Sequence, residues 1–220
     1  MKFEPARLAV TLLGDRLSGA VIRRNRVEAF VVEAENPAAA LRAELDARGV
    51  TARSVALGLA RAAVTVKPIE LPPVVGETRE MVRFELERHL PFPADDAPFD
   101  FLPLQPEAGP GQPAQARRVL IAAADRRVVD AALRLAEDAK LRPVSVTVAA
   151  HELLALAQPE RNQRVAWVHR TGDTADLLLA RGGDIVGSRS VPAAEPAALA
   201  AEIGRSFAVA RWRGCDAVWV

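Results

Sequence analysis

The sequence contains a single cysteine, Cys215, and three histidines, and this scarcity limits the chemistry that it can support. One cysteine excludes an internal disulfide and a thiolate zinc cluster, and it fits a reducing compartment. No two histidines lie at the spacing of a metal site. We therefore interpret His151, at a predicted helix start, and His169, at a turn edge, as structural residues.

The sequence also has almost no excess of charge of either sign. Lys and Arg number 29, Asp and Glu number 28, and the formal net charge is +1. A nucleic-acid backbone requires a concentrated positive surface, so we expect no nucleic-acid partner. The densest basic run, residues 23–26, lies at a predicted hairpin tip and is interpreted as a solvated loop.

No stretch approaches the ~20 consecutive apolar residues that a membrane-spanning helix needs. Glu4 and Pro5 stand where a signal peptide requires an apolar run. The sequence therefore predicts a soluble, cytoplasmic protein. Residues 217–220 have the pattern of a buried strand that breaks off, so we expect further residues after Val220, which could include a membrane anchor.

A hairpin module occurs twice in the chain. Residues 12–27 have the order strand, turn, strand, turn, strand, and residues 170–185 repeat it without a gap. Gly14-Asp15 aligns with Gly172-Asp173, and such turn residues tolerate the positive φ that two-residue hairpins need. The pattern suggests two pseudo-symmetric subdomains facing one another across a cleft. Turn chemistry shared by unrelated meanders is the alternative.

Hydrophobic periodicity predicts helices and strands around these meanders. The predicted helices cover residues 36–49, 77–90, 125–139, 149–157 and 196–212. The further predicted strands cover residues 54–59, 64–71, 99–104, 119–124, 144–148 and 216–220. Pro68 makes its strand an edge or bulged strand. Met81 and Phe84 lie off the apolar stripe of their helix, so two of its sides can find apolar partners.

This order predicts an α/β protein with an actin-like (ribonuclease H-like) fold and mixed sheets, truncated at its C-terminus. We divide it into three parts. The first actin-like subdomain comprises residues 1–63 and 143–158, an inserted α+β subdomain comprises residues 64–142, and the second, incomplete actin-like subdomain comprises residues 159–220.

The inserted block carries a resemblance to a known family. Residues 66–72 (VKPIELP), the helix over 80–87, Leu90-Pro91-Phe92-Pro93 and residues 99–101 (FDF) resemble the inserted subdomain of the PilM family. Residues 119–124 and 199–207 are similar to later segments of that family. PilM-like proteins, and the cytoplasmic domains of GspL-like proteins, lie under the inner-membrane platform of type IV pilus and type II secretion machines. The resemblance covers nearly the whole chain and implies that role here.

The resemblance also directs attention to the nucleotide site of actin-like proteins. That pattern places an Asp and then a Gly in each phosphate hairpin, the Asp to orient magnesium and water, the Gly to let backbone N–H groups reach phosphate. The corresponding positions here are Thr11, Leu13 and Gly14 in the first hairpin, and His169, Thr171 and Gly172 in the second. Because both carboxylates are missing, we expect no hydrolysis and no required cofactor. Residual ATP binding stays open.

Other candidate catalytic residues have simpler interpretations. Asp15 and Asp173 could be displaced metal ligands, but Gly-Asp is a favourable turn pair. Ser18 and Ser188 lie on predicted strands, whereas an exposed serine nucleophile needs a sharp strand-to-helix turn. The sequence therefore predicts no catalytic residue and no metal site.

Residues 85–93 have the character of a docking edge, because an amphipathic helix ends at a proline beside an aromatic residue. Alternatively, Phe92 fills the core of its own subdomain. The resemblance implies that a partner's short N-terminal tail lies in the groove between the inserted and first subdomains. The predicted partner contacts are Val66, Ile69, Leu86, Leu90 and Phe92.

These observations predict a non-catalytic cytoplasmic scaffold of a pilus or secretion platform. Its expected partners are a PilN-like or other inner-membrane platform protein and the assembly ATPase, and a homodimer is a further expectation. Two alternatives remain, which are an active actin-like ATPase or kinase with atypical ligands, and a cell-division adaptor resembling FtsA.

Overall fold

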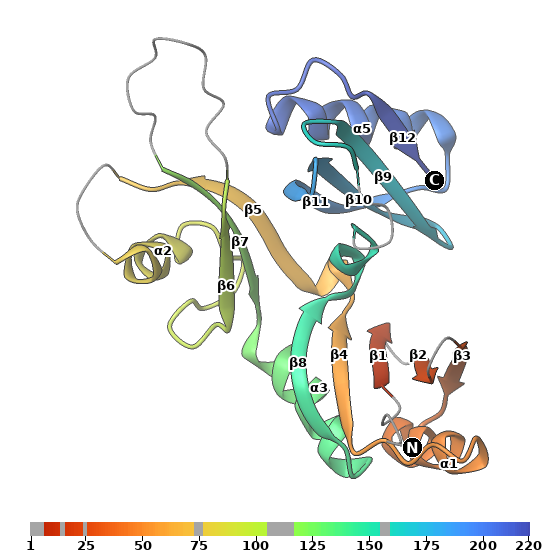
Figure 1. The fold of residues 1–220 in the computed structure, drawn as a ribbon. Coiled ribbons are helices and arrows are strands. Elements are labelled where there is room, and N and C mark those ends of the chain that lie inside the picture. Colours follow the sequence, from red (N-terminus) through yellow and green to blue (C-terminus); the bar gives the residue numbers. More distant parts are fainter. Residues whose placement is uncertain (1–6, 14–15, 24–25, 73–76, 105–116, 155–158) are drawn as a thin grey trace. The chain divides into compact units, whose positions relative to one another are not determined.

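The computed structural model describes residues 7–13, 16–23, 26–72, 77–104, 117–154 and 159–220 (Figure 1). The chain forms two compact units. Unit 1 contains Met1–Ala63 and Arg126–Ala149, and unit 2 contains Val64–Asp125 and Ala150–Val220.

Unit 1 is built on a five-stranded mixed sheet with the order β3-β2-β1-β4-β8. Its strands are β1 (Arg7–Leu13), β2 (Arg16–Arg23), β3 (Arg26–Glu33), β4 (Ser54–Leu59) and β8 (Arg142–Val148). The first three pair antiparallel, whereas β4 pairs parallel with both β1 and β8. Each parallel pair needs a crossover connection, and helices provide both of them.

Helix α1 (Pro37–Ala47) is the first crossover, and its local signals are those expected from the sequence. The Asn36 side-chain oxygen accepts a hydrogen bond from the Ala39 N–H at 3.1 Å, and Pro37 occupies the first turn. Gly49 follows the helix with φ +60°. Leu41 and Leu45 are fully buried, so one stripe of α1 covers the sheet.

Helix α3 (Arg126–Asp138) packs on β4 and β8 and against α1, and therefore belongs to unit 1. The sequence analysis assigned residues 126–142 to the inserted subdomain, and the structure differs on this point. The reason is the small buried face of Ala132, Leu135 and Ala136, which lets the helix lie close on the sheet that β8 joins. Periodicity predicts such a face but does not show which sheet it covers.

The inserted part of unit 2 is a three-stranded antiparallel sheet with the order β5-β7-β6. It consists of β5 (Val64–Glu70), β6 (Phe99–Pro103), β7 (Arg118–Ala124) and helix α2 (Thr78–Leu86). The Leu71 N–H donates to the Arg117 carbonyl at 2.8 Å, so the alternation along β5 turns Pro68 away from β7. Strand β5 lies at the edge of this sheet, which confirms the prediction made from Pro68. No ladder hydrogen bond is lost at the proline.

The second meander forms another sheet of unit 2, with the order β11-β10-β9-β12. Its elements are β9 (Arg164–Thr171), β10 (Thr174–Arg181), β11 (Asp184–Pro192), α5 (Pro196–Val209) and β12 (Ala217–Trp219). The bounds of β10 lie 158 positions after those of β2, and the same interval separates the starts of β11 and β3. The repeated module is therefore present in the fold as well as in the sequence.

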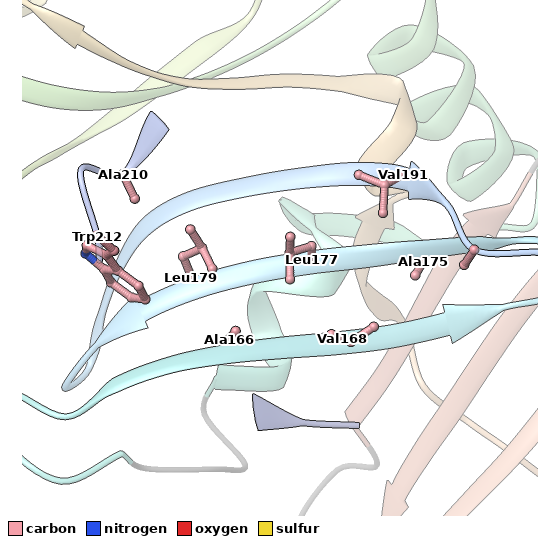
Figure 2. Packing of buried hydrophobic residues seen from close by; sticks show 9 residues of the cluster. Ala166, Val168, Ala175, Leu177, Leu179, Val191, Ala210 and Trp212 are labelled. Atoms are coloured by element: carbon pink, nitrogen blue, oxygen red, sulfur yellow. The ribbon is translucent and has the colours of Figure 1, made fainter. Parts of the chain in front are cut away.

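One face of this sheet forms a continuous apolar core, shown in Figure 2. Leu177 and Leu179 point from β10 to the same side as Val168 and Val191 of the neighbouring strands. The α5 residues that pack on this face are Leu199, Ile203 and Phe207. Trp212 closes one end of the core, with its ring centroid 6.0 Å from that of Phe207.

Several predicted helices are shorter in the structure. Helix α2 ends at Leu86, and hydrogen bonds of single helical turns continue to Leu90. Pro91 disfavours the helical conformation in Leu90 and so prevents any further extension. Two 3₁₀ helices are present, η1 (Arg61–Ala63) and η2 (Ala149–Leu153), and η2 lies at the start of the predicted helix over 149–157.

Gly19 provides a test of the unit 1 core. It pairs with Phe30 across β2 and β3, and an added Cβ would lie 2.1 Å from the Phe30 ring. We expect Gly19→Ala to displace the ring and to lower the free energy of unfolding by about 1–3 kcal/mol, measured by urea unfolding.

Gly204→Ala is the matched control. Gly204 is exposed inside α5 and has no atom within 4 Å of the new Cβ, so it should raise stability by about 0.5–1 kcal/mol. Equal effects of the two substitutions would contradict the packing described for Gly19.

Candidate functional site

The β1–β2 hairpin holds the first group of predicted nucleotide-site positions. Thr11 pairs with Ser18, and its Oγ1 lies 2.7 Å from the place that a Cβ on Gly58 would take. The Ala149 Cβ lies 3.0 Å from the same point. The Thr11 side chain therefore packs on bare backbone of β4; that it replaces an actin-like carboxylate stays a prediction. Gly14 and Asp15 lie outside the described residues.

The remaining position of this hairpin, Leu13, is half-buried at the end of β1 and pairs with Arg16. A leucine side chain offers no donor or acceptor to a phosphate. The side chain at this position therefore contributes no hydrogen bond to a phosphate.

The β9–β10 hairpin holds the second group, all of it exposed. Gly172 has φ +61°, as the turn prediction required, and the Asp173 carbonyl accepts a hydrogen bond from the Ala193 N–H at 2.8 Å. Thr174 Oγ1 donates to the Thr171 carbonyl at 3.1 Å. His169 lies opposite Asp176 on the neighbouring strand. These contacts close the turn and leave the side chains of His169 and Thr171 in solvent.

Other predicted structural residues lie where the sequence placed them. Ser18 is half-buried on β2 and Ser188 is buried on β11, while His151 lies in η2. Across the described residues, no three His, Cys, Asp or Glu side chains gather as a metal site would require. In the same residues, no helix has both the length and the apolar character to span a membrane.

The predicted partner surface divides into buried and accessible residues. Ile69 and Leu86 are 3% and 0% exposed and belong to the core between α2 and the inserted sheet, and Val66 is also buried. Leu90 is half-buried against that core, whereas Phe92 is half-buried outside it. A partner could reach only the last two without opening the subdomain. That any of the five binds a partner stays a prediction.

The outer edge of β6 is protected against the addition of another strand. The Leu104 N–H donates to β7, so alternation turns the polar groups of Phe99 and Phe101 outward. The Arg79 guanidinium donates to the Phe99 carbonyl at 3.3 Å, and Asp100 Oδ1 accepts from the Phe101 N–H at 3.0 Å. Pro103 has no N–H to offer. Capping of this kind prevents edge-to-edge pairing.

Comparison with known families connects these features to a biological context. The family described as type IV pilus assembly protein PilM matches residues 11–178. The chain belongs to the PilM family. The match begins at the first hairpin, includes the whole inserted sheet, and ends in β10 of the second meander. A search of curated proteins found no match.

Solved structures show that the PilM-family chain has an actin-like fold. A PilM protein in a "PilM-PilN type IV pilus biogenesis complex" is 24% identical, with a TM-score of 0.68 over 93% of this chain and 68% of its own. The cytoplasmic domain of EpsL, an inner-membrane component of the Vibrio cholerae type II secretion system, is 21% identical, with a TM-score of 0.62 over 89% and 75%.

A third structural relative is a Bacteroides thetaiotaomicron protein with an actin-like ATPase fold and unknown function. It is 12% identical, with a TM-score of 0.58 over 96% of this chain and 79% of its own. At these identities the structures show the fold alone. The family match adds the relation to type IV pilus proteins.

His89, which follows α2, has a pKa below its usual value. Burial is the main cause that lowers its pKa, and the positive charge of Lys67 on β5 lowers it further, whereas Glu85 raises it. The Nδ1 atom is buried and has no hydrogen-bond partner among the described residues. The folded protein therefore holds His89 neutral at pH 7.

This shift predicts a pH dependence of stability. The unfolded chain binds a proton at His89 below about pH 6.5, while the folded chain resists it, so stability is lost as the pH falls from 6.5 through the lower folded pKa. Urea midpoints measured at pH 7.5 and pH 5.5 should differ less for His89→Gln than for the unsubstituted chain. An unchanged difference would show that His89 does not titrate in this way.

Proposed function

We propose that this PilM-family chain is a non-catalytic scaffold of an inner-membrane assembly platform, and that it binds the cytoplasmic tail of a PilN-like membrane protein. The family match over residues 11–178 carries the proposal, because it includes the complete inserted sheet. Two structural relatives belong to such platforms, one in a complex with PilN and one as an inner-membrane secretion component. The scaffold would then work at the cytoplasmic face of the inner membrane.

The hairpin residues support the absence of catalysis. An actin-like ATPase uses a carboxylate to orient magnesium and its water, and Thr11 and His169 stand at those positions. The Thr11 side chain packs on Gly58 and Ala149, so it already has a structural role. The assembly ATPase as a second partner, and a homodimer, follow only from the resemblance and remain parts of the proposal.

The partner can be tested directly by calorimetry. A synthetic peptide with the cytoplasmic tail sequence of the PilN-like protein from the same organism should bind the chain. Phe92→Ala should weaken that binding about tenfold, because an accessible aromatic side chain beside rigid prolines is a typical anchor. Val209→Ala, which truncates an exposed side chain of α5, is the control and should bind normally. A peptide that does not bind the unsubstituted chain would refute the proposed partnership.

The lack of catalysis has its own test. Calorimetry with ATP and Mg²⁺, together with a phosphate-release assay, should detect no turnover, because neither hairpin carries a carboxylate at the position that orients the metal in actin-like ATPases. An actin-like ATPase measured under the same conditions is the positive control. Micromolar binding with steady hydrolysis would instead favour an active enzyme that uses atypical ligands.

A further inference from the structure

Helix α2 presents an aromatic side chain to solvent. Phe84 is 75% exposed and is the one aromatic among the exposed large apolar side chains of the described residues. The opposite side of the helix carries Val82 and Leu86, both fully buried. Phe84 cannot reach the core unless the helix turns and those two residues leave it. Aromatic side chains, Phe among them, are enriched at protein–protein interfaces relative to the rest of the surface.

The helix that carries Phe84 is held firmly in place. The guanidinium groups of Arg79 and Arg83 lie 4.7 and 5.9 Å from the centroid of the Phe99 ring. The Arg117 guanidinium donates to Thr78 Oγ1 at 2.7 Å, which fastens the start of the helix. A side chain on a rigid element loses little freedom on binding, so Phe84 is preorganised as an anchor.

Carboxylates surround Phe84 on the same face of the helix. Helical spacing places Glu80 one turn before it, Glu87 one turn after it, and Glu77 two turns before it. All three are exposed, and within the described ranges the structure shows no ion pair for them. Arg88 also lies on this side, but it pairs with Glu85 at 3.4 Å. The face around Phe84 is therefore acidic with an apolar centre.

We propose that this acidic face, defined by Phe84 with Glu77, Glu80 and Glu87, binds a Lys/Arg-rich amphipathic segment of the membrane-anchored partner. The inference rests on the proposed function, which supplies a partner with a cytoplasmic segment close to a membrane span. Such segments carry an excess of Lys and Arg, and this charge complements the three carboxylates. Phe84 inserts between apolar side chains of the segment, and the carboxylates face its cations.

The mode of binding follows from the neighbouring strand. Because the outer edge of β6 is capped by Arg79, by Asp100 and by Pro103, an extended segment gains no backbone ladder there. Recognition at α2 therefore depends on side chains, and a helical segment with one apolar stripe presents them at matching spacing. Interfaces of this kind combine a central aromatic anchor with a charged rim.

The test measures binding of the full chain to a fluorescent peptide that spans the cytoplasmic segment of the PilN-like partner. Phe84→Ala should weaken binding about tenfold, and Phe84→Leu should retain most of it. Glu80→Lys with Glu87→Lys should weaken it by at least about tenfold at low salt and by less at high salt, because exposed charges are screened. Since these side chains are exposed, the variants should melt at the temperature of the unsubstituted chain.

Two matched controls separate this face from general surface effects. Val209→Ala removes an exposed apolar side chain from α5, and Glu137→Lys with Asp138→Lys reverses two exposed charges at the end of α3. Both should leave the affinity within about twofold, which is the ordinary effect of surface changes outside a binding site.

The outcomes distinguish the inference from the proposed function. If the unsubstituted chain binds the segment and Phe84→Ala binds equally well, the inference is overturned and the proposed partnership stands. If Phe84→Ala loses affinity but the charge reversal does not, a basic segment is the wrong occupant. If the unsubstituted chain does not bind, both the partnership and this surface are refuted.

Discussion

Each half of the repeat depends on one parallel strand pair, β1 with β4 in unit 1 and β9 with β12 in unit 2. Antiparallel neighbours can be joined by a tight turn, but parallel neighbours require a connection that returns along the sheet. Helices α1 and α5 are those connections, and each buries its apolar stripe on the sheet that it crosses. The common constraint accounts for the same order of elements in both halves.

A second parallel pair, β4 with β8, explains the place of the inserted sheet. The chain between these two strands contains β5, α2, β6, β7 and α3. Only α3 returns to unit 1, where it packs on both strands, so the rest of the connection is free to form its own sheet and core. The connection between β4 and β8 thus contains a separately packed sheet and helix, and the candidate partner residues lie on them.

The two candidate sites differ in what their side chains already do. Thr11 fills space against Gly58, and the second hairpin uses its hydroxyl and carbonyl groups to close its own turn. On α2, by contrast, Phe84 is exposed, and within the described part of the chain no ion pair holds Glu77, Glu80 or Glu87. Groups without a structural task are the better candidates for recognition, because leaving an aromatic ring in water is unfavourable.

The sequence alone determined much of the local structure of this protein. Asn36, Pro37 and Gly49 set the bounds of α1, Pro68 placed β5 at an edge, and the Gly172 turn aligned two meanders. Such signals act over a few residues, so the sequence alone is enough to predict the elements that they bound.

Only the tertiary structure decided which surfaces those elements cover. The apolar stripe of α3 could have packed on either sheet. Ile69 and Leu86, which were predicted as partner contacts, are enclosed by the core of the inserted sheet. Met81 and Phe84 both lie off the apolar stripe of α2, but Met81 packs on the inserted core whereas Phe84 is exposed. Burial depends on which distant segment arrives opposite a side chain, and no local pattern carries that information.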